Sequence, residues 1–392
     1  MALSEQDRFV DEPLRRKIGL ILSGGGARAA YQVGVLKAIS QLLPRDAVNP
    51  FPILCGTSAG AINATVLAIY ATRFREGVKR LTLVWKMFRP DMVYRSDARG
   101  MLMSSAHWFA AMVLGGLGKY NPTSLLDSSP LHQLLERYVP CDKIQDSIDA
   151  GALRALCVTA SGYTSGEAVS FYQGTADLRP WKRARRVGSA TKITAAHLLA
   201  SAAIPFVFPA VKVNREYFGD GSTGQLAPIS PALHLGADRV LVIGVRQPDS
   251  EDTPRSRVES YPSLAEVAGH VLNSIFLESL EADLERLQRI NRTISVISPE
   301  DRERAGIQLR PVEVLVIAPS VDLGELAQQY SHYLPRPVRL LLRGIGVKNH
   351  SGASLLSYLL FEKAYCRKLI SLGYADTMQR KTEVMRFLHL QP

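Results

Sequence analysis

Two short apolar runs near the start of the chain each lead through a turn of small residues into a helical pattern. Residues 17–22 form the first run, which is followed by a glycine cluster and a helical pattern over residues 29–43. Residues 51–55 form the second run, which passes through another small-residue turn into a helical pattern over residues 59–70. Two successive strand–turn–helix units are typical of a parallel sheet covered by helices. The sequence therefore predicts an α/β fold with a mainly parallel sheet.

The same organisation continues along the 392 residues. Short apolar runs predict further strands at residues 153–160, 168–172, 240–245 and 312–317. A long helix is predicted to follow Ser263, where a capping box begins. We expect three parts: a mobile tail at residues 1–16, a main domain at residues 17–320, and a mainly helical C-terminal extension at residues 321–392.

The segment Gly56-Thr57-Ser58-Ala59-Gly60 lies between the second predicted strand and its helix. It matches the pattern G-x-S-x-G, in which a serine sits on a sharp strand-to-helix turn. The flanking glycines avoid clashes with the strand and the helix, and the turn presents the hydroxyl at a helix N-terminus. The segment therefore predicts Ser58 as a nucleophile supported by Gly56 and Gly60. A purely structural tight turn is the alternative.

The glycine cluster after the first predicted strand reads Gly24-Gly25-Gly26-Ala27-Arg28. Backbone N–H groups in such a loop form a concave donor site that can hold the oxyanion of an acyl-transfer reaction. Glycine also lets the backbone approach a substrate closely, because it has no Cβ. We therefore expect oxyanion donors at Gly24, Gly25 and Gly26. For Arg28 the roles of steadying this loop, meeting an anionic headgroup, or lying on a helix surface all stay open.

The same loop also fits a dinucleotide-binding pattern, Gly24-x-Gly26-x-x-Ala29, directly after a strand. Asp46 follows about 20 residues later, as that pattern requires. However, prolines bracket Asp46 in a predicted loop, whereas the ribose-binding acid should end a second strand. An oxidoreductase that binds a dinucleotide is therefore an alternative function.

An acidic residue flanked by glycines, Asp220, follows a valine-containing run. By itself this pattern is typical of a turn. Beside a serine nucleophile, an aspartate within hydrogen-bonding reach can accept the serine proton. Asp220 is therefore the predicted base, supported by Gly221. A triad with a late histidine is the alternative, and His350 has the right place in the chain for it.

Together these segments resemble the patatin-like phospholipase family. The likeness is carried by residues 24–28, by residues 56–60 and by Asp220-Gly221. A fourth segment, Ala200-Ser201-Ala202-Ala203-Ile204-Pro205, is similar to the one that precedes the catalytic aspartate in that family. Order and spacing match from about Lys17 to Arg246.

The resemblance implies a three-layer α/β/α sandwich and a Ser58–Asp220 dyad without a catalytic histidine. It also implies oxyanion donors in the glycine loop, no cofactor and no metal, and cleavage of fatty acyl esters of phospholipids or other lipids through an acyl-enzyme. Two positions depart from the family pattern. Ser222 stands where that family often has glycine or alanine, and Leu226 stands where it often has asparagine. Both lie near the predicted base and put the substrate fit in doubt.

The formal net charge of +11 favours anionic partners such as lipid headgroups. Four basic residues beside Trp181 form the densest cluster: Lys182, Arg183, Arg185 and Arg186. We expect this cluster, together with the apolar Trp108 and Phe109, to contact an anionic membrane. A solvated surface and core packing are the respective alternatives. The sequence has no nucleic-acid-binding motif, so we expect no nucleic-acid partner.

The first 16 residues contain no apolar signal-peptide core. Residues 47–72 and 100–118 are free of charge, but glycine, proline or polar residues interrupt both stretches, so neither is a convincing transmembrane helix. The four cysteines show no close pairing, which favours a reducing compartment. We therefore expect a cytoplasmic lipid acyl hydrolase with peripheral contact to the membrane. A non-catalytic membrane-binding protein is a further alternative. Headgroup, acyl position and oligomeric state stay open.

Overall fold

The computed structural model describes residues 18–95, 124–247, 264–307, 309–339 and 350–390, without the side chains of residues 264–279 and 350–354. The predicted tail at residues 1–16, the apolar stretch at residues 100–118 and the pair Trp108 and Phe109 therefore lie outside the described residues.

Ten strands in the described part of the chain form one mixed sheet in the order β10-β9-β1-β2-β3-β4-β6-β5, with β8 pairing β3 and β7 pairing β8. Five neighbouring strands run parallel to one another: β1 (Ile18–Leu22), β2 (Ile53–Thr57), β3 (Ala155–Gly162), β9 (Arg239–Ile243) and β10 (Glu313–Ile317). The remaining strands are β4 (Ala168–Gly174), β5 (Trp181–Arg183), β6 (Arg186–Ala190), β7 (Val211–Val213) and β8 (Glu216–Asp220).

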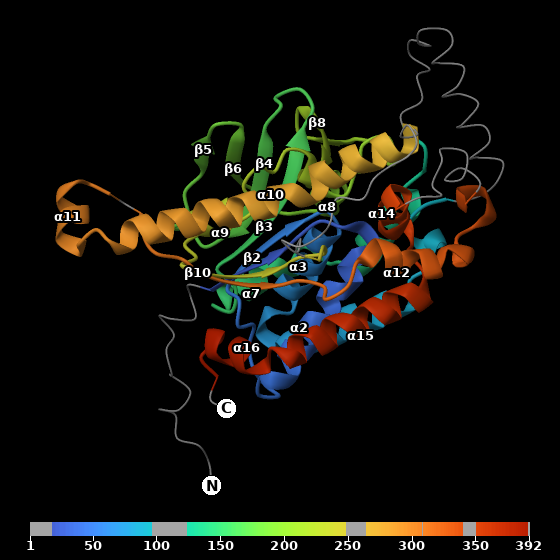
Figure 1. Cartoon of the computed structure of the whole chain (residues 1–392). Helices are drawn as coiled ribbons and strands as arrows, with labels where there is room; N and C mark the ends of the chain where they lie inside the picture. The colour runs from blue at the N-terminus through green and yellow to red at the C-terminus, as the bar shows by residue number, and fades with distance from the viewer. Residues whose placement is uncertain (1–17, 96–123, 248–263, 308, 340–349, 391–392) are drawn as a thin grey trace, which may run out of the picture.

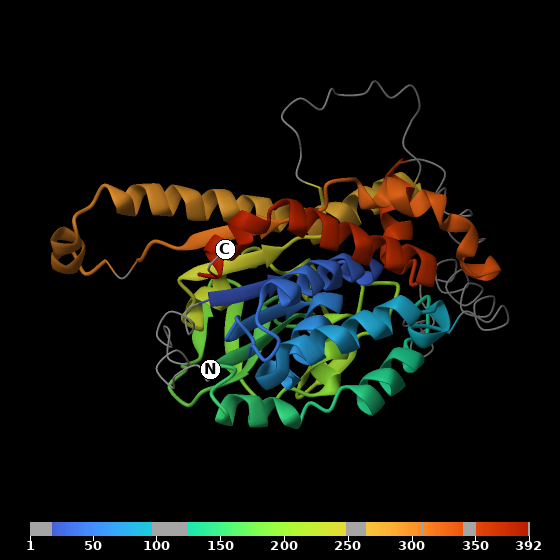
Figure 2. The ribbon, with the colours of Figure 1, turned by 90° about the horizontal axis from the view of Figure 1, so that it is seen from below.

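Helices cover both faces of this sheet (Figures 1 and 2). One face carries α2 (Ala30–Leu42), α3 (Ala59–Ile69) and α4 (Phe74–Met87), and the other carries α9 (Ser230–His234) and the long α10 (Leu264–Ser295). Alternate residues of a strand point to opposite faces. Accordingly, Leu54 belongs to the first core and its neighbours Ile53 and Cys55 to the second. This arrangement confirms the predicted α/β/α sandwich.

The remaining α-helices of the described residues lie mostly in the second half of the chain. They are α6 (Ser129–Tyr138), α7 (Lys143–Asp149), α8 (Ala195–Ser201), α11 (Pro299–Arg304), α12 (Leu323–Gln329), α14 (His350–Leu359), α15 (Lys363–Gln379) and α16 (Lys381–Phe387). The last four confirm that the C-terminal region is helical. The boundary of that region at residue 321 stays a prediction.

The sequence analysis assigned no strand to β5, β6, β7 or β8. These strands have three to five residues each, and β5 and β6 carry the basic cluster as an antiparallel hairpin. Charged and half-exposed side chains remove the apolar signal on which a strand prediction depends. The basic cluster thus lies at one edge of the sheet.

In the described part of the chain, no helix has the length and apolarity needed to cross a bilayer. Residues 47–72, one of the two charge-free stretches, contribute β2 and α3 to the folded core.

The C-terminal α15 packs closely along α2, the first helix of the sandwich (Figure 1). A β-carbon at Gly373 would lie 2.2 Å from the carbonyl oxygen of Tyr31, and one at Gly34 would lie 2.2 Å from the carbonyl oxygen of Ile370. The Tyr31 hydroxyl also donates a 3.0 Å hydrogen bond to Asp376. Two glycines therefore set the distance between these helices.

We predict that Gly373→Ala lowers the free energy of unfolding by about 1–3 kcal/mol, the usual cost of overpacking. Urea denaturation followed by circular dichroism measures this change. Gly244→Ala is the control, because a β-carbon there would meet neighbours at 3.7 Å, an ordinary contact distance. Equal unfolding midpoints for the two variants would contradict the close packing of α2 and α15.

Candidate active site

The strand β3 brings the ends of two other strands together. One edge of β3 pairs with β4 over residues 155–161, so β2 and β8 share the other edge of β3. Thr57, the last residue of β2, lies opposite Thr159, and Asp220, the last residue of β8, lies opposite Ala160. Because β2 runs parallel and β8 antiparallel to β3, their C-terminal ends meet. The residue that follows β2, Ser58, therefore lies beside Asp220.

Ser58 occupies a sharp turn between β2 and α3. Its backbone angles are φ 53° and ψ −131°, which few residues other than glycine adopt. A β-carbon at Gly56 would lie 2.5 Å from the Cα of Ala61, and one at Gly60 would lie 2.3 Å from the carbonyl oxygen of Leu22. Only glycine fits at either position without a shift of the backbone.

A buried serine that the sequence analysis left without a role connects the turn to the sheet. The Ser58 N–H donates a 2.9 Å hydrogen bond to Ser201 Oγ, which donates a 2.6 Å hydrogen bond to the Thr159 carbonyl. Two residues further on, the Ala203 carbonyl accepts a 2.8 Å hydrogen bond from the Asp220 N–H. One segment thus positions both predicted dyad residues. A serine within a run of alanines was the available signal for it.

Asp220 is fully buried at the end of β8. Burial raises the pKa of this carboxyl from its usual 3.8 to about 6, although hydrogen bonding with Ser58 and Ser222 lowers the pKa in part. Its Oδ1 accepts a 2.9 Å hydrogen bond from the Ser222 N–H. Its Oδ2 accepts no hydrogen bond of ordinary geometry from the residues described.

The glycine loop lies against the turn that carries Ser58. A β-carbon at Gly24 would lie 3.2 Å from the Cβ of Ser58 and 2.4 Å from Ser222 Oγ. Within the described ranges, the N–H groups of Gly24, Gly25 and Gly26 donate no hydrogen bond to another residue. Free amide donors next to a serine hydroxyl are the arrangement that stabilises an oxyanion.

Gly221, the residue after the predicted base, also has no room for a side chain. A β-carbon there would lie 2.1 Å from the carbonyl oxygen of Thr159, so the backbone of the Asp220 turn rests directly on β3.

Arg28 is buried, with 4% of its surface exposed. Its Nε donates a 2.6 Å hydrogen bond to Ser357 Oγ, and its guanidinium lies 4.6 Å from the centre of the Tyr358 ring. The alternative of a charge on the helix surface is therefore wrong. The side chain connects the glycine loop to α14.

A second buried network holds the other side of the same loop. Gln32 Nε2 donates a 2.7 Å hydrogen bond to the Ser23 carbonyl, directly before Gly24. Asn63 Nδ2 donates to Gln32 Oε1 at 3.0 Å, and Trp85 Nε1 donates to Asn63 Oδ1 at 2.8 Å. Ser23, the residue before the loop, is thus bonded to α2 and linked through Gln32 and Asn63 to α3 and α4.

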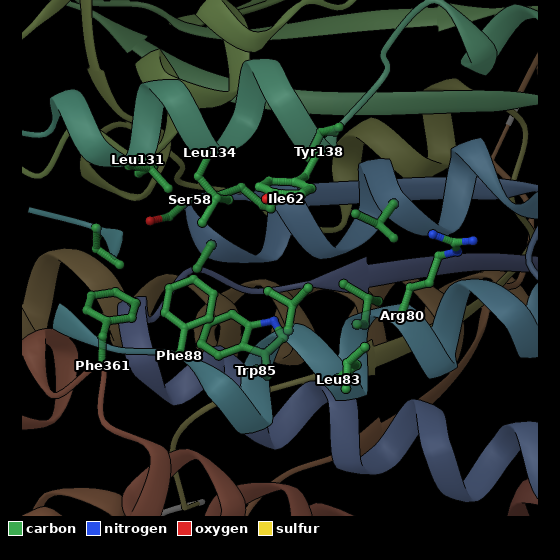
Figure 3. Close-up of a pocket in the computed structure, with 18 of the residues that line it drawn as sticks. Ser58, Ile62, Arg80, Leu83, Trp85, Phe88, Leu131, Leu134, Tyr138 and Phe361 are labelled. Atoms are coloured by element: carbon green, nitrogen blue, oxygen red, sulfur yellow. The ribbon is translucent and has the colours of Figure 1, made fainter. Parts of the chain in front are cut away.

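An apolar pocket of about 310 Å³ opens at Ser58 (Figure 3). It follows α3 away from the serine, along Ile62 and Val66 on one face of that helix and Tyr70 directly after it. In Figure 3, Ser58 and Arg80 lie towards opposite ends of the lining. The other walls are apolar side chains that include Leu81, Leu83, Trp85, Phe88, Leu131, Leu134, Ile204, Phe208 and Phe361. The shape and lining suit a hydrocarbon chain.

Other predicted contact residues lie elsewhere. Lys182, Arg183, Arg185 and Arg186 are on the β5–β6 hairpin, and none of them lines this pocket. Lys182 Nζ lies 3.7 Å from Glu167 in an exposed ion pair.

Asp46, the acid of the dinucleotide alternative, lies in the turn after α2 and not at a strand end. His350 begins α14, and its side chain is not among those described.

Fold and site together define an α/β protein with a serine on a strand-to-helix turn, a buried aspartate beside it and an apolar pocket. The family model described as patatin-like phospholipase matches residues 20–233, more than half of the chain. The chain belongs to this family, as its sequence motifs predicted.

Individual relatives are similar over a shorter stretch. Lysophospholipase nte1 from Aspergillus terreus is 38% identical over 86 residues, which is 20% of this chain and 5% of that protein. Lysophospholipase nte1 from Aspergillus oryzae is 36% identical over 86 residues, with the same two shares of 20% and 5%. The aligned segment is therefore a small part of these relatives. The crystal structure of VipD from Legionella pneumophila aligns with a TM-score of 0.37 and 12% identity, covering 95% of this chain and 67% of that one.

Proposed function

We propose that this protein hydrolyses acyl esters of lipids, with Ser58 as nucleophile and Asp220 as its base. The Ser58 oxygen attacks the ester carbonyl while Asp220 accepts the hydroxyl proton. The amides of Gly24, Gly25 and Gly26 stabilise the oxyanion. As the oxyanion collapses, the proton passes to the leaving alcohol. A water molecule then attacks the acyl-enzyme, which releases the fatty acid and restores the Ser58 hydroxyl.

One observation carries this proposal: β2 and β8 end beside each other on the edge of β3, which supports a direct proton transfer between Ser58 and Asp220. The raised pKa of the buried aspartate, about 6, makes it a stronger base than an exposed carboxylate. The apolar pocket that starts at Ser58 supports a long acyl chain as the group transferred.

Relatives described as lysophospholipases support a phospholipid with one acyl chain as the first substrate to test. The pocket extends in a single direction along α3, which is consistent with a substrate that has one acyl chain. The dinucleotide oxidoreductase loses support, because the family match and the position of Asp46 both speak against it.

We predict that Ser58→Ala and Asp220→Asn each lower the release of fatty acid from lysophosphatidylcholine by about 10⁴–10⁶-fold, the loss seen for single residues of a serine triad. Ser58→Ala also abolishes covalent labelling by a fluorophosphonate probe, detected by mass spectrometry. Ser147→Ala is the matched control, because Ser147 is equally buried but bonds the Ile69 carbonyl, away from the site.

Retained labelling or hydrolysis in Ser58→Ala would refute the serine mechanism. A nicotinamide dinucleotide that binds wild type and Ser58→Ala alike would instead support the oxidoreductase. Vesicle binding without any hydrolysis by the wild type would support a non-catalytic membrane-binding protein.

The pH dependence of kcat/KM follows from the pKa of Asp220. The carboxyl must be ionised to accept a proton, and its pKa is raised to about 6. We therefore predict a plateau above pH 6 and a decline of about tenfold per pH unit below it. Initial rates on a soluble ester between pH 4 and pH 9 measure this. A rate that stays flat down to about pH 4, near the usual pKa of aspartate, contradicts the proposed base.

We further propose that the protein contacts lipid surfaces peripherally, at the rim of the pocket. Leu83 and Met87 on α4 are 60% and 55% exposed, and Tyr138 at the end of α6 is 64% exposed. Exposed apolar side chains beside an apolar pocket are typical of a lipid-binding face. Lys79, Arg80 and Lys86 on α4 add positive charge that favours anionic headgroups. The β5–β6 hairpin stays a second proposed contact.

Binding to phosphatidylglycerol-containing vesicles, measured by co-sedimentation, tests both contacts. We predict weaker binding for Leu83→Glu combined with Met87→Glu, since both changes add negative charge to an apolar rim. We also predict weaker binding when all four basic hairpin residues become Glu, at about 1 kcal/mol per residue. Val296→Glu, at a site that is 82% exposed, is the control. If a variant binds vesicles as well as the control does, the corresponding proposed contact is refuted.

A further inference from the structure

The segment of residues 357–361 reaches the site from far along the chain. It lies outside residues 20–233, which match the family model, and comprises the end of α14 and the two residues that follow it. All five residues are buried. They contact both the glycine loop and the apolar pocket.

Two side chains of this segment hold Arg28. Ser357 Oγ accepts the 2.6 Å hydrogen bond from Arg28 Nε, and the Tyr358 ring lies 4.6 Å from the guanidinium. Arg28 follows the proposed oxyanion glycines by two residues and belongs to the same short helix, η2 (Gly26–Ala29). A shift of Arg28 would therefore move the donors of the loop.

The backbone of the segment also contacts the loop directly. A β-carbon at Gly26 would lie 2.3 Å from the carbonyl oxygen of Tyr358, and Gly26 has a φ of +53°. The pKa of the Tyr358 hydroxyl is raised to about 12, mainly by burial; Arg28 and Arg246 lower this pKa in part, and the charge of Asp220 contributes to the rise. The carbonyl of Tyr358 therefore fixes the backbone at Gly26 while its ring packs on Arg28.

Phe361 forms part of the pocket wall. Its ring lies 5.7 Å from that of Phe88 and 6.4 Å from that of Trp85, centre to centre. Tyr94 packs edge-on against it and donates a 3.1 Å hydrogen bond to the Leu359 carbonyl. Figure 3 shows Phe361 and Phe88 on the opposite side of the pocket from Leu131 and Leu134.

We propose that residues 357–361 contribute to the active site. Ser357 and Tyr358 position the oxyanion loop, and Phe361 contacts the acyl chain and determines which chain lengths fit the pocket. This inference rests on the proposed ester hydrolysis. It assigns a role in the reaction to a segment of the C-terminal region, which the family match does not cover.

Steady-state kinetics with p-nitrophenyl acetate test the positioning role. Because misplacing reacting groups by about 1 Å can cost 10²-fold in rate, Ser357→Ala and Tyr358→Leu are expected to lower kcat by about 10- to 100-fold with little change in KM. Tyr358→Phe keeps the ring over Arg28 and is expected to recover most of that loss. Thr377→Val is the control, because Thr377 is an equally buried hydroxyl that bonds its own helix at the Gly373 carbonyl.

The ratio of kcat/KM for p-nitrophenyl decanoate to that for the acetate tests Phe361. Phe361→Ala is expected to lower this ratio by about 10-fold or more, since lost hydrocarbon contacts in a pocket discriminate by about 10–200-fold. Phe387→Ala is the control, because Phe387 is also a buried C-terminal phenylalanine but packs on Arg239.

The inference is overturned if the Ser357 and Tyr358 variants keep the kcat of Thr377→Val, or if Phe361→Ala keeps the substrate ratio of Phe387→Ala. The proposed function fails separately, if Ser58→Ala retains the hydrolysis of the wild type. Thermal unfolding of every variant confirms that the rates compare folded proteins.

Discussion

The site depends on the fact that a β-strand has two edges. On β3 one edge is taken by β4, so β2 and β8 share the other and meet end to end. This meeting places Ser58 beside Asp220 although 162 positions separate them in the sequence. Neither residue needs a long or flexible side chain to reach the other, because backbone hydrogen bonds of the sheet set their separation. Ser201 adds to this control by linking the Ser58 amide to the Thr159 carbonyl.

Two unfavourable features are concentrated at this meeting point. Ser58 has a strained backbone, which costs about 1–3 kcal/mol in comparable cases. Asp220 is a carboxyl without exposure to water, and its raised pKa reflects that cost. Close backbone packing around the two residues holds both features in place. Glycines at positions 56, 60 and 221 permit this packing, because a side chain at any of them would clash with neighbouring backbone. Strain and desolvation at the same point are typical of sites built for chemistry.

Local patterns allowed much of this to be predicted from the sequence. Apolar runs followed by small-residue turns predicted the parallel strands, and glycine spacing predicted the Ser58 turn. Each of these signals spans only a few consecutive residues. The β5–β8 strands were missed, since they are short and several are charged or half-exposed. The bond between Ser201 and Ser58 spans 143 positions, and that between Arg28 and Ser357 spans 329. Contacts of that kind leave no local pattern, so a single sequence does not reveal them.

The glycine-to-backbone contacts between α2 and α15 have a consequence for how the molecule assembles. Tyr31 and Asp376 are 345 positions apart, so their hydrogen bond closes a loop that includes nearly the whole chain. Closing so long a loop costs conformational entropy before any contact is gained, and non-local contacts of this kind slow folding. The helix that follows the glycine loop is therefore supported by residues that are translated 345 positions later. A ribosome-bound chain that stops before α14 has the serine turn and the aspartate already translated, but not the packing that holds the neighbouring loop in place.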